Sequence, residues 1–289
     1  MSVGQNMRDI KRRIRSFQNM KQITKAMEMV AAAKLRRAQE RAESARPYAE
    51  KMREVIVSIA SNTQGISHPM LETRPIRKTG YLVITSDRGL AGGYNANLLR
   101  TFTKSLRERH KSSDEYVIFA VGRKGRDFLK KRGYPVIDEV TGLADSPEFP
   151  DIKPIASRAV GFYAEEKVDQ LYLVYNEFIN PVTQRPVEKQ LLPLTSFEEN
   201  KGAKTLYEYE PSEEEVLAKL LPRYAETLIY SALLEAKAGE FGARMAAMGN
   251  ATDNATELIQ EYTLYYNRAR QASITQEINE IVAGANALS

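Results

Sequence analysis

The stretch that decides the fold begins with PSEEEVLAKLLP (211–222) and continues to Leu288 without another proline. Ser212 followed by three glutamates is typical of a helix start, because serine caps free amides and acidic residues favour the first turn. Since nothing after Pro222 forces the helix to end, the sequence predicts one helix as far as Leu288. About 75 residues at ~1.5 Å per residue span roughly 110 Å, several times the width of an ordinary domain. Such a helix cannot be buried within its own globule.

Apolar residues along this helix recur at steps of three and four positions, which places them on one narrow seam. The seam residues are Leu258, Tyr262, Tyr265, Ala269, Ile274, Ile278, Ile281, Ala285 and Leu288. Between 238 and 249 the seam consists of small residues, so a neighbouring backbone can come close. The pattern predicts a second helix packed along the first. A long helix buried in a large bundle is the alternative.

A second helix-forming stretch lies at the other end of the chain, where no glycine or proline occurs between position 5 and Pro47. Its apolar seam comprises Ile10, Ile14, Phe17, Met20 or Lys21, Thr24, Met27, Ala31 and Leu35, and continues after Pro47 at Met52, Val55, Ile56 and Ile59. Two long helices at opposite ends of one chain can pair antiparallel. Because the C-terminal helix is the longer, we expect 274–288 to project without a partner.

Short β-rich runs alternate with helical stretches between these two helices. The expected strands are 81–85, 116–121, 136–137 and 171–175, and the expected helices are 95–109, 123–132 and 154–167. This alternation predicts a βαβ domain with a mainly parallel sheet. Two further strand candidates, 187–194 and 205–209, form a hairpin-like return toward the C-terminal helix.

The predicted fold class is therefore α/β: a long antiparallel coiled coil of N- and C-terminal helices with an inserted Rossmann-like α/β domain. The expected divisions are a helix at 1–60, a connecting loop at 61–79, the α/β domain at 80–210 and the second helix at 211–289.

Composition narrows the possible functions. The 289 residues include no cysteine, which excludes disulfides, thiolate catalysis and cysteine-ligated zinc. The only two histidines, His68 and His110, stand far apart in the sequence. We expect no catalytic, cofactor or metal site. No apolar run approaches the ~18 residues of a membrane span, and residues 1–10 lack the core of a signal peptide. The sequence therefore predicts a soluble intracellular chain without direct membrane insertion.

Positive charge is concentrated near the N-terminus. Residues 1–50 hold twelve basic and five acidic residues, a net charge of +7, whereas the whole chain carries +5. Basic helical segments bind nucleic acid or acidic protein surfaces. A basic coiled-coil protein that binds nucleic acid is therefore one functional alternative.

The most site-like stretch is SDRGLAGGYN (86–95), which lies where a strand hands over to a helix. Glycines at such a position often let backbone amides hold a phosphate, so a nucleotide-binding enzyme is a further alternative. The other interpretation is a tight turn whose Asp87 and Arg88 meet a partner protein. GRKGR (122–126) also follows a strand, as a phosphate site or as a solvated helix start. Neither the Rossmann fingerprint nor the P-loop motif occurs in the chain.

Four stretches resemble the γ subunits of bacterial F-type ATP synthases, and the resemblance covers the chain from end to end. They are ITKAMEMVAA (23–32), SDRGL (86–90), AAM with NATDNA (246–248 and 250–255) and NRARQASITQEI (267–278). The resemblance implies a non-catalytic rotor shaft that couples proton-driven c-ring rotation to ATP synthesis and hydrolysis in an α3β3 head, with a regulatory role in ATPase activity and proton flow. It also implies partners α, β, ε and the c-ring, no nucleic acid, and a peripheral position at the cytoplasmic face of the cell membrane.

The resemblance also implies residue roles. The expected contacts with β subunits are Lys21, Lys25, Met27, Arg244, Arg270, Gln271 and Thr275. The expected bearing tip consists of Ile274, Ile278, Ile281 and Leu288. The residues expected to face ε and the c-ring are Asp87, Arg88, Tyr207, Tyr209 and Glu210. Two positions depart from the pattern: Ala91 stands where many relatives have cysteine, and Gly249 where lysine is expected. Because no cysteine-bearing insertion is present, we expect no thiol control of rotation.

Overall fold

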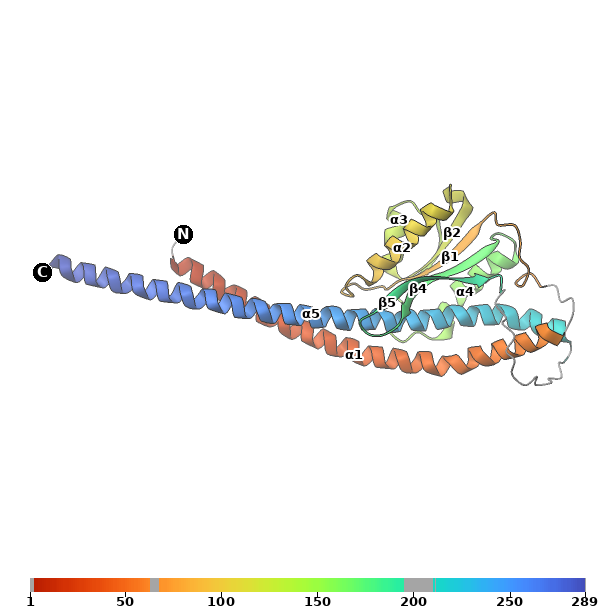
Figure 1. Ribbon diagram of the computed structural model, residues 1–289, viewed down its shortest axis with the longest axis horizontal. Helices are drawn as coiled ribbons and strands as arrows, with labels where there is room; N and C mark the ends of the chain where they lie inside the picture. The colour runs from red at the N-terminus through yellow and green to blue at the C-terminus, as the bar shows by residue number, and fades with distance from the viewer. Residues whose placement is uncertain (1–2, 63–67, 195–209, 211, 289) are drawn as a thin grey trace. The chain divides into compact units, whose positions relative to one another are not determined.

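The computed structural model describes residues 3–62, 68–194, 210 and 212–288 (Figure 1). In chain order its elements are α1 (Val3–Asn62), β1 (Thr79–Ile84), α2 (Tyr94–Arg109), the 3-10 helix η1 (Ser113–Glu115), β2 (Tyr116–Val121), α3 (Arg123–Lys131), β3 (Val136–Val140), α4 (Phe149–Ala164), β4 (Gln170–Phe178), β5 (Gln184–Leu192) and α5 (Glu213–Leu288). The chain divides into two compact units, one of Met1–Val30 with Met245–Ser289 and the other Ala31–Arg244. Both long helices contribute to both units.

The two long terminal helices are confirmed. At the start of α5 the backbone N–H of Glu215 donates to Ser212 Oγ at 3.2 Å, which satisfies one of the free amides of the first turn. The helix then continues through Pro222, and α1 continues through Pro47. Each proline removes one backbone hydrogen bond, but the flanking turns hold the helix together.

In the first unit the two helices pack antiparallel, as predicted. The ring of Phe17 contacts that of Tyr262 at 5.3 Å, and Thr24 further along α1 meets Thr252 earlier in α5. On α1, Lys21 and not Met20 occupies the seam, since Lys21 is half-buried and Met20 is exposed.

One predicted seam residue of α5 was wrong. Tyr265 is exposed, and Tyr266 is half-buried in its place. The seam side chains that are buried or partly buried are Ala255, Ile259, Tyr262 and Tyr266, at steps of four, three and four. The choice between a step of three and a step of four is set by the partner surface, because an α-helix repeats every 3.6 residues.

The second unit contains a five-stranded sheet in the order β3-β2-β1-β4-β5. The pairs β1–β2, β1–β4 and β2–β3 are parallel, and β4–β5 is an antiparallel hairpin. The mainly parallel sheet is thus confirmed, while the candidate strand at 205–209 lies outside the described residues. Helix α4 begins five residues before its predicted start, because Glu148 and Asp151 form a reciprocal capping box ahead of it.

Helices cover both faces of this sheet (Figure 1). Alternate residues of β1 point to opposite faces: Leu82 and Ile84 join a core with α1, α4 and α5, whereas Tyr81 and Val83 join a core with α2 and α3. All of β1 is buried, which explains why its sequence is a continuous apolar run rather than an alternating one.

The end of α2 holds a histidine whose titration should be visible in stability. His110 Nε2 lies 2.9 Å from the hydroxyl of Tyr81, and its Nδ1 lies 3.5 Å from a carboxylate oxygen of Glu115. Burial lowers the pKa of His110 below its ordinary value, although the charge of Glu115 opposes this. Burial also lowers the pKa of His68, the only other histidine, with Glu72 opposing.

Because folding favours the neutral rings, the unfolded chain takes up protons first as the pH falls through about 6.5. We expect the melting temperature to be flat from pH 7.5 to about 6.5 and to fall below it. His110→Gln should reduce the slope between pH 6.5 and 5, and adding His68→Gln should reduce it further. Calorimetry at closely spaced pH values checks this, and an unchanged slope in the double variant would show that carboxylates dominate.

Candidate functional site

The turn after β1 is closed by its own side chains. The N–H of Ser86 donates to Asn95 Oδ1 at 3.0 Å, the Asn95 amide donates to Ser86 Oγ at 2.7 Å, and Ser86 Oγ donates to the carbonyl of Arg88 at 2.7 Å. Leu90 adopts a φ of 61° at its tip, which is unusual for a branched side chain. The turn therefore holds Arg88 and Leu90 exposed in a fixed backbone conformation.

The amides that could bind phosphate beside this turn are already occupied. At the start of α3 the N–H of Arg123 donates to Asp87 Oδ1 at 2.9 Å, that of Lys124 to the Ser86 carbonyl at 3.0 Å, and that of Gly125 to Thr85 Oγ1 at 2.8 Å. Phosphate binding at a helix start needs free amides. The geometry thus disfavours phosphate binding at the start of α3, in the 122–126 stretch, and one carboxylate oxygen of Asp87 is used within the chain.

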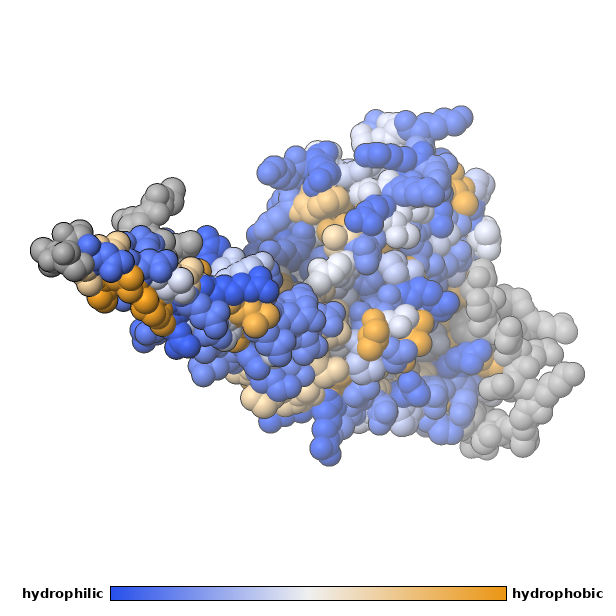
Figure 2. All heavy atoms as spheres, turned by 60° about the vertical axis from the view of Figure 1, so that its left-hand side comes forward, coloured by the Kyte–Doolittle hydropathy of each residue, from blue (hydrophilic) through white to orange (hydrophobic). Residues whose placement is uncertain are grey.

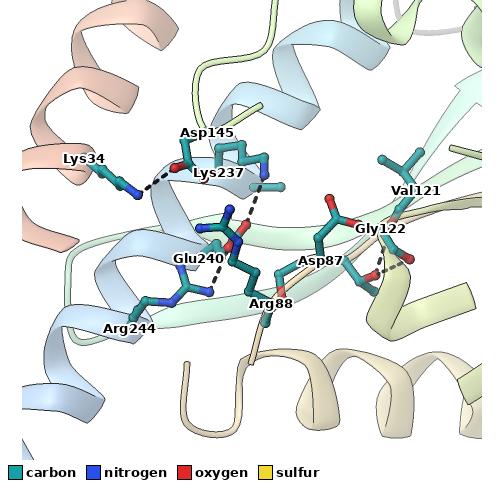
Figure 3. Close-up of polar contacts among 12 residues, drawn as sticks. Lys34, Asp87, Arg88, Val121, Gly122, Asp145, Lys237, Glu240 and Arg244 are labelled. Carbon is teal, nitrogen blue, oxygen red and sulfur yellow. Dashed lines mark hydrogen bonds and ion pairs between the residues drawn. The ribbon is translucent and has the colours of Figure 1, made fainter. Parts of the chain in front are cut away.

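A buried ion network joins this turn to α5 (Figure 3). The Glu240 side chain, 5% exposed, lies between two cations: Arg244 Nη2 at 2.9 Å and Lys237 Nζ at 3.4 Å. The side chains of Lys237 and Arg244 are 7% and 12% exposed. Arg244 Nη2 also donates to the carbonyl of Gly89 at 3.2 Å. Arg244, predicted as a partner contact, is thus engaged inside its own unit.

A second ion pair ties the loop between β3 and α4 to α1. Lys34 Nζ lies 2.6 Å from Asp145 Oδ2, and Arg41 donates to the carbonyls of Ser146 and Pro147 in the same loop. Burial alone would raise the pKa of Asp145, but the hydrogen bond and charge of Lys34 outweigh it, with smaller help from other cations, so the pKa lies below its usual value. Asp145 is therefore ionised at neutral pH, and its carboxylate holds the loop to Lys34.

Sequence reasoning missed this network. The spacing of Lys237, Glu240 and Arg244 by three and four places them on one helix face and was a usable signal. Nothing local in the sequence indicates that Asp145 pairs with Lys34, because the two are 111 positions apart.

The first unit displays the other predicted contact residues. On α1, Lys25 is exposed and lies 3.2 Å from Glu28, while Lys21 and Met27 are half-buried. On α5 the side chains of Arg270, Gln271, Thr275, Ile274, Ile278 and Ile281 are all exposed. Figure 2 shows hydrophobic side chains in orange along the end of α5. The side chain of Leu288, and Tyr207 and Tyr209, lie outside the described residues, and Glu210 is exposed.

Gly249 faces Glu28 across the helix pair with room to spare. A Cβ added there would lie 3.7 Å from the Glu28 carboxyl carbon, an ordinary van der Waals distance. Gly249→Ala should therefore raise the free energy of unfolding by about 1 kcal/mol, because alanine is the better helix former. Urea denaturation measures this. The matched control is Gly242→Ala in the same helix, where the added Cβ would lie 3.2 Å from Pro181 Cα and stability should fall; equal effects at both sites would contradict the packing.

Among the described residues, no group of three histidine, aspartate or glutamate side chains is placed to hold a metal ion. Across the same part of the chain, no helix combines the length and apolarity needed to cross a membrane.

Comparisons with known proteins agree on one family. A family described as ATP synthase matches residues 6–288. The ATP synthase gamma chain of Brevibacillus brevis is 65% identical over 285 residues, which is 99% of each chain. A chain from the central stalk and c-ring structure of Tetrahymena thermophila mitochondrial ATP synthase has a TM-score of 0.61 at 26% identity, covering 79% of this chain and 99% of that one.

A rotor chain of Euglena gracilis mitochondrial ATP synthase has the same fold, with a TM-score of 0.65 at 20% identity over 94% of this chain and 99% of that one. Nothing in these matches supports the nucleic-acid alternative. Because this chain is 65% identical to the Brevibacillus gamma chain over 99% of both sequences, it shares the family's role as a stalk component without a catalytic site of its own. The chain belongs to the γ-chain family of ATP synthases.

Proposed function

We propose that this chain is the central rotor shaft of an F-type ATP synthase, coupling proton-driven rotation of a c-ring to ATP synthesis and hydrolysis in an α3β3 head. One observation carries the proposal: 65% identity to a bacterial gamma chain over 99% of both sequences. The antiparallel helix pair, with α5 extending as an exposed single helix, gives that role a physical basis.

The shaft acts because its surface differs from side to side. A helix end that turns inside a ring presents a different set of side chains to each β subunit in sequence. Each set favours a different conformation of the subunit it touches, so rotation shifts three conformational equilibria in turn. When the head hydrolyses ATP, the shaft turns in the reverse direction and drives the c-ring. Because both processes pass through this chain, it also regulates ATPase activity and proton flow.

The first unit supplies the proposed contacts with the head. Arg270, Gln271 and Thr275 are exposed on α5 and meet a β subunit, and the exposed Ile274, Ile278 and Ile281, with Leu288, form the bearing tip. On α1, exposed Lys25 with the half-buried Lys21 and Met27 meets an acidic β surface. Such charge contacts are salt-sensitive, which suits a contact that forms and breaks. Arg244 reaches a β subunit only if its bond to Gly89 opens.

The other proposed contacts belong to the inserted domain at 80–210, between helices at 1–60 and 211–289. Asp87, Arg88, Tyr207, Tyr209 and Glu210 face ε and the c-ring. The complex then holds this chain peripherally at the cytoplasmic face of the cell membrane, without a nucleic-acid partner or a bound cofactor.

Reconstitution tests the proposal. The chain should co-elute with three α and three β subunits and stimulate their ATP turnover. A chain that does neither would overturn the proposal. In the assembled enzyme, Lys25→Glu should lower the protons pumped per ATP hydrolysed, because it reverses a charge facing an acidic β surface. Lys153→Glu, at an exposed site on α4, is the control with the same charge change. An unchanged ratio in Lys25→Glu would reject the electrostatic contact.

A further inference from the structure

The helical layer formed by α2 and α3 carries a strong positive charge that the proposed shaft function does not use. Residues 94–132 hold eleven basic and four acidic residues, a net charge of +7, whereas the whole chain carries only +5. Both helices pack one face of the sheet through Leu98, Phe102 and Leu129, so their opposite sides face outward. In Figure 2 hydrophilic side chains project from the upper part of the α/β unit, where Figure 1 places these helices.

Most of the exposed cations of this layer are unpaired. The outward basic face is defined by Arg100, Arg107, Arg123, Lys124 and Lys131, all of them exposed. Within the described residues none of the five forms an ion pair. The acidic partners nearby are used elsewhere: Glu188 holds Arg109 at 2.8 Å, and Glu139 holds Lys130. The face therefore keeps a positive field directed at solvent.

Folding does not require this excess of charge. Helix α4 covers the other face of the same sheet, and residues 149–167 hold three basic and three acidic residues, a net charge of zero. Helices on the two faces of one sheet thus pack equally well with very different net charges, +7 and zero. A generic solvated surface would show a mixture of signs on both.

The arrangement also costs stability. Arg100, Lys104 and Arg107 follow one another at a spacing of four and three, so like charges meet on one side of α2, relieved only by Glu108 at 3.7 Å from Lys104. The first turn of α3 holds Arg123 and Lys124 and no acidic residue of its own, so the carboxylate of Asp87, which accepts from the Arg123 N–H, offsets only part of the positive charge at that end of the helix dipole. Binding to a negatively charged partner would offset both penalties.

We propose that the outward basic face binds an acidic polypeptide segment of a partner protein. The five cations lie on two rigid helices, and the layer exposes no large apolar side chain among residues 94–132. Membrane-surface helices insert apolar or aromatic residues, and single-stranded nucleic acid stacks on aromatic ones, so the face suits neither well. An acidic polypeptide needs only charge complementarity, and such binding is fast, reversible and salt-dependent.

The test uses the full chain and a fluorescent poly-L-glutamate of about 20 residues, with polyglutamine of the same length as the neutral probe. The face variant is Arg100→Glu, Arg107→Glu, Lys131→Glu. The control variant, Lys153→Glu, Lys219→Glu, Arg223→Glu, makes the same change in net charge at exposed sites outside the face. Charge reversal replaces attraction to polyglutamate with repulsion. The face variant should therefore bind polyglutamate at least about tenfold more weakly at low salt. The control variant should stay within about twofold of the parent chain.

Three results would overturn the proposal. Equal weakening in both variants would show that net charge and not the face matters. No binding of polyglutamate by the parent chain at low salt would remove the site. Face-dependent binding to phosphatidylglycerol vesicles that is tighter than binding to polyglutamate would assign the face to a membrane. Melting temperatures establish that the variants fold, and Arg→Gln and Lys→Gln versions replace any that do not.

Discussion

Gly122→Ala is expected to destabilise the α/β unit by about 3 kcal/mol or more. Gly122 adopts a φ of +92° at the end of β2, and an added Cβ would lie 2.1 Å from the carbonyl oxygen of Thr85. That contact is with backbone, which cannot move aside without breaking the β1–β2 pairing. Urea unfolding of the purified variant measures the loss.

A matched control separates crowding from backbone strain. Gly133 has a φ of +73° but nothing within 4 Å of an added Cβ. Gly133→Ala should therefore cost only the left-handed conformation, about 1–2 kcal/mol. If Gly122→Ala were no more costly than Gly133→Ala, the close approach of Gly122 to Thr85 would be wrong.

Glu240→Ala is expected to lower the free energy of unfolding by about 3–5 kcal/mol, because it leaves two buried cations without their carboxylate. Lys237 and Arg244 both lie against Glu240, and water reaches neither freely. The same change should also release the Gly89 turn, since Arg244 loses the partner that orients it. Chemical denaturation gives the loss, and hydrogen exchange at the turn amides reports the release.

The converse replacement sharpens this test. Lys237→Met, Glu240→Leu, Arg244→Met removes the whole ion network and leaves apolar side chains of similar size. Because a buried network returns little net stability, this triple variant should be clearly more stable than Glu240→Ala. A triple variant as unstable as the single one would show that the network itself contributes the stability.

How much of the structure the sequence predicts depends on how local the determinant is. The helices α1 and α5 follow from long stretches without proline, before Pro47 in α1 and after Pro222 in α5, and from the Ser212 cap, which are local features. The strands follow from short apolar runs. Tyr265 was wrongly placed in the seam because the step of three or four at one turn depends on the partner helix.

The candidate site was less predictable for the same reason. The first backbone N–H of α3 donates to one carboxylate oxygen of Asp87, which the sequence did not indicate, while the contact of Asp87 with a partner stays a prediction. Lys34 and Asp145 meet only through the tertiary fold. The charge of α2 and α3 was missed, because the sequence analysis counted charge only for residues 1–50 and for the whole chain. The outward orientation of these helices could not be predicted, because it depends on the sheet face on which they pack.

The central claim is that this chain turns inside an α3β3 head. The most direct test immobilises the head, attaches a bead to an exposed residue of the α/β unit and records the bead under ATP. The account predicts rotation in one direction, with one pause for each β subunit and loss of rotation without ATP. An assembly that contains the chain and hydrolyses ATP while the bead stays still would contradict it.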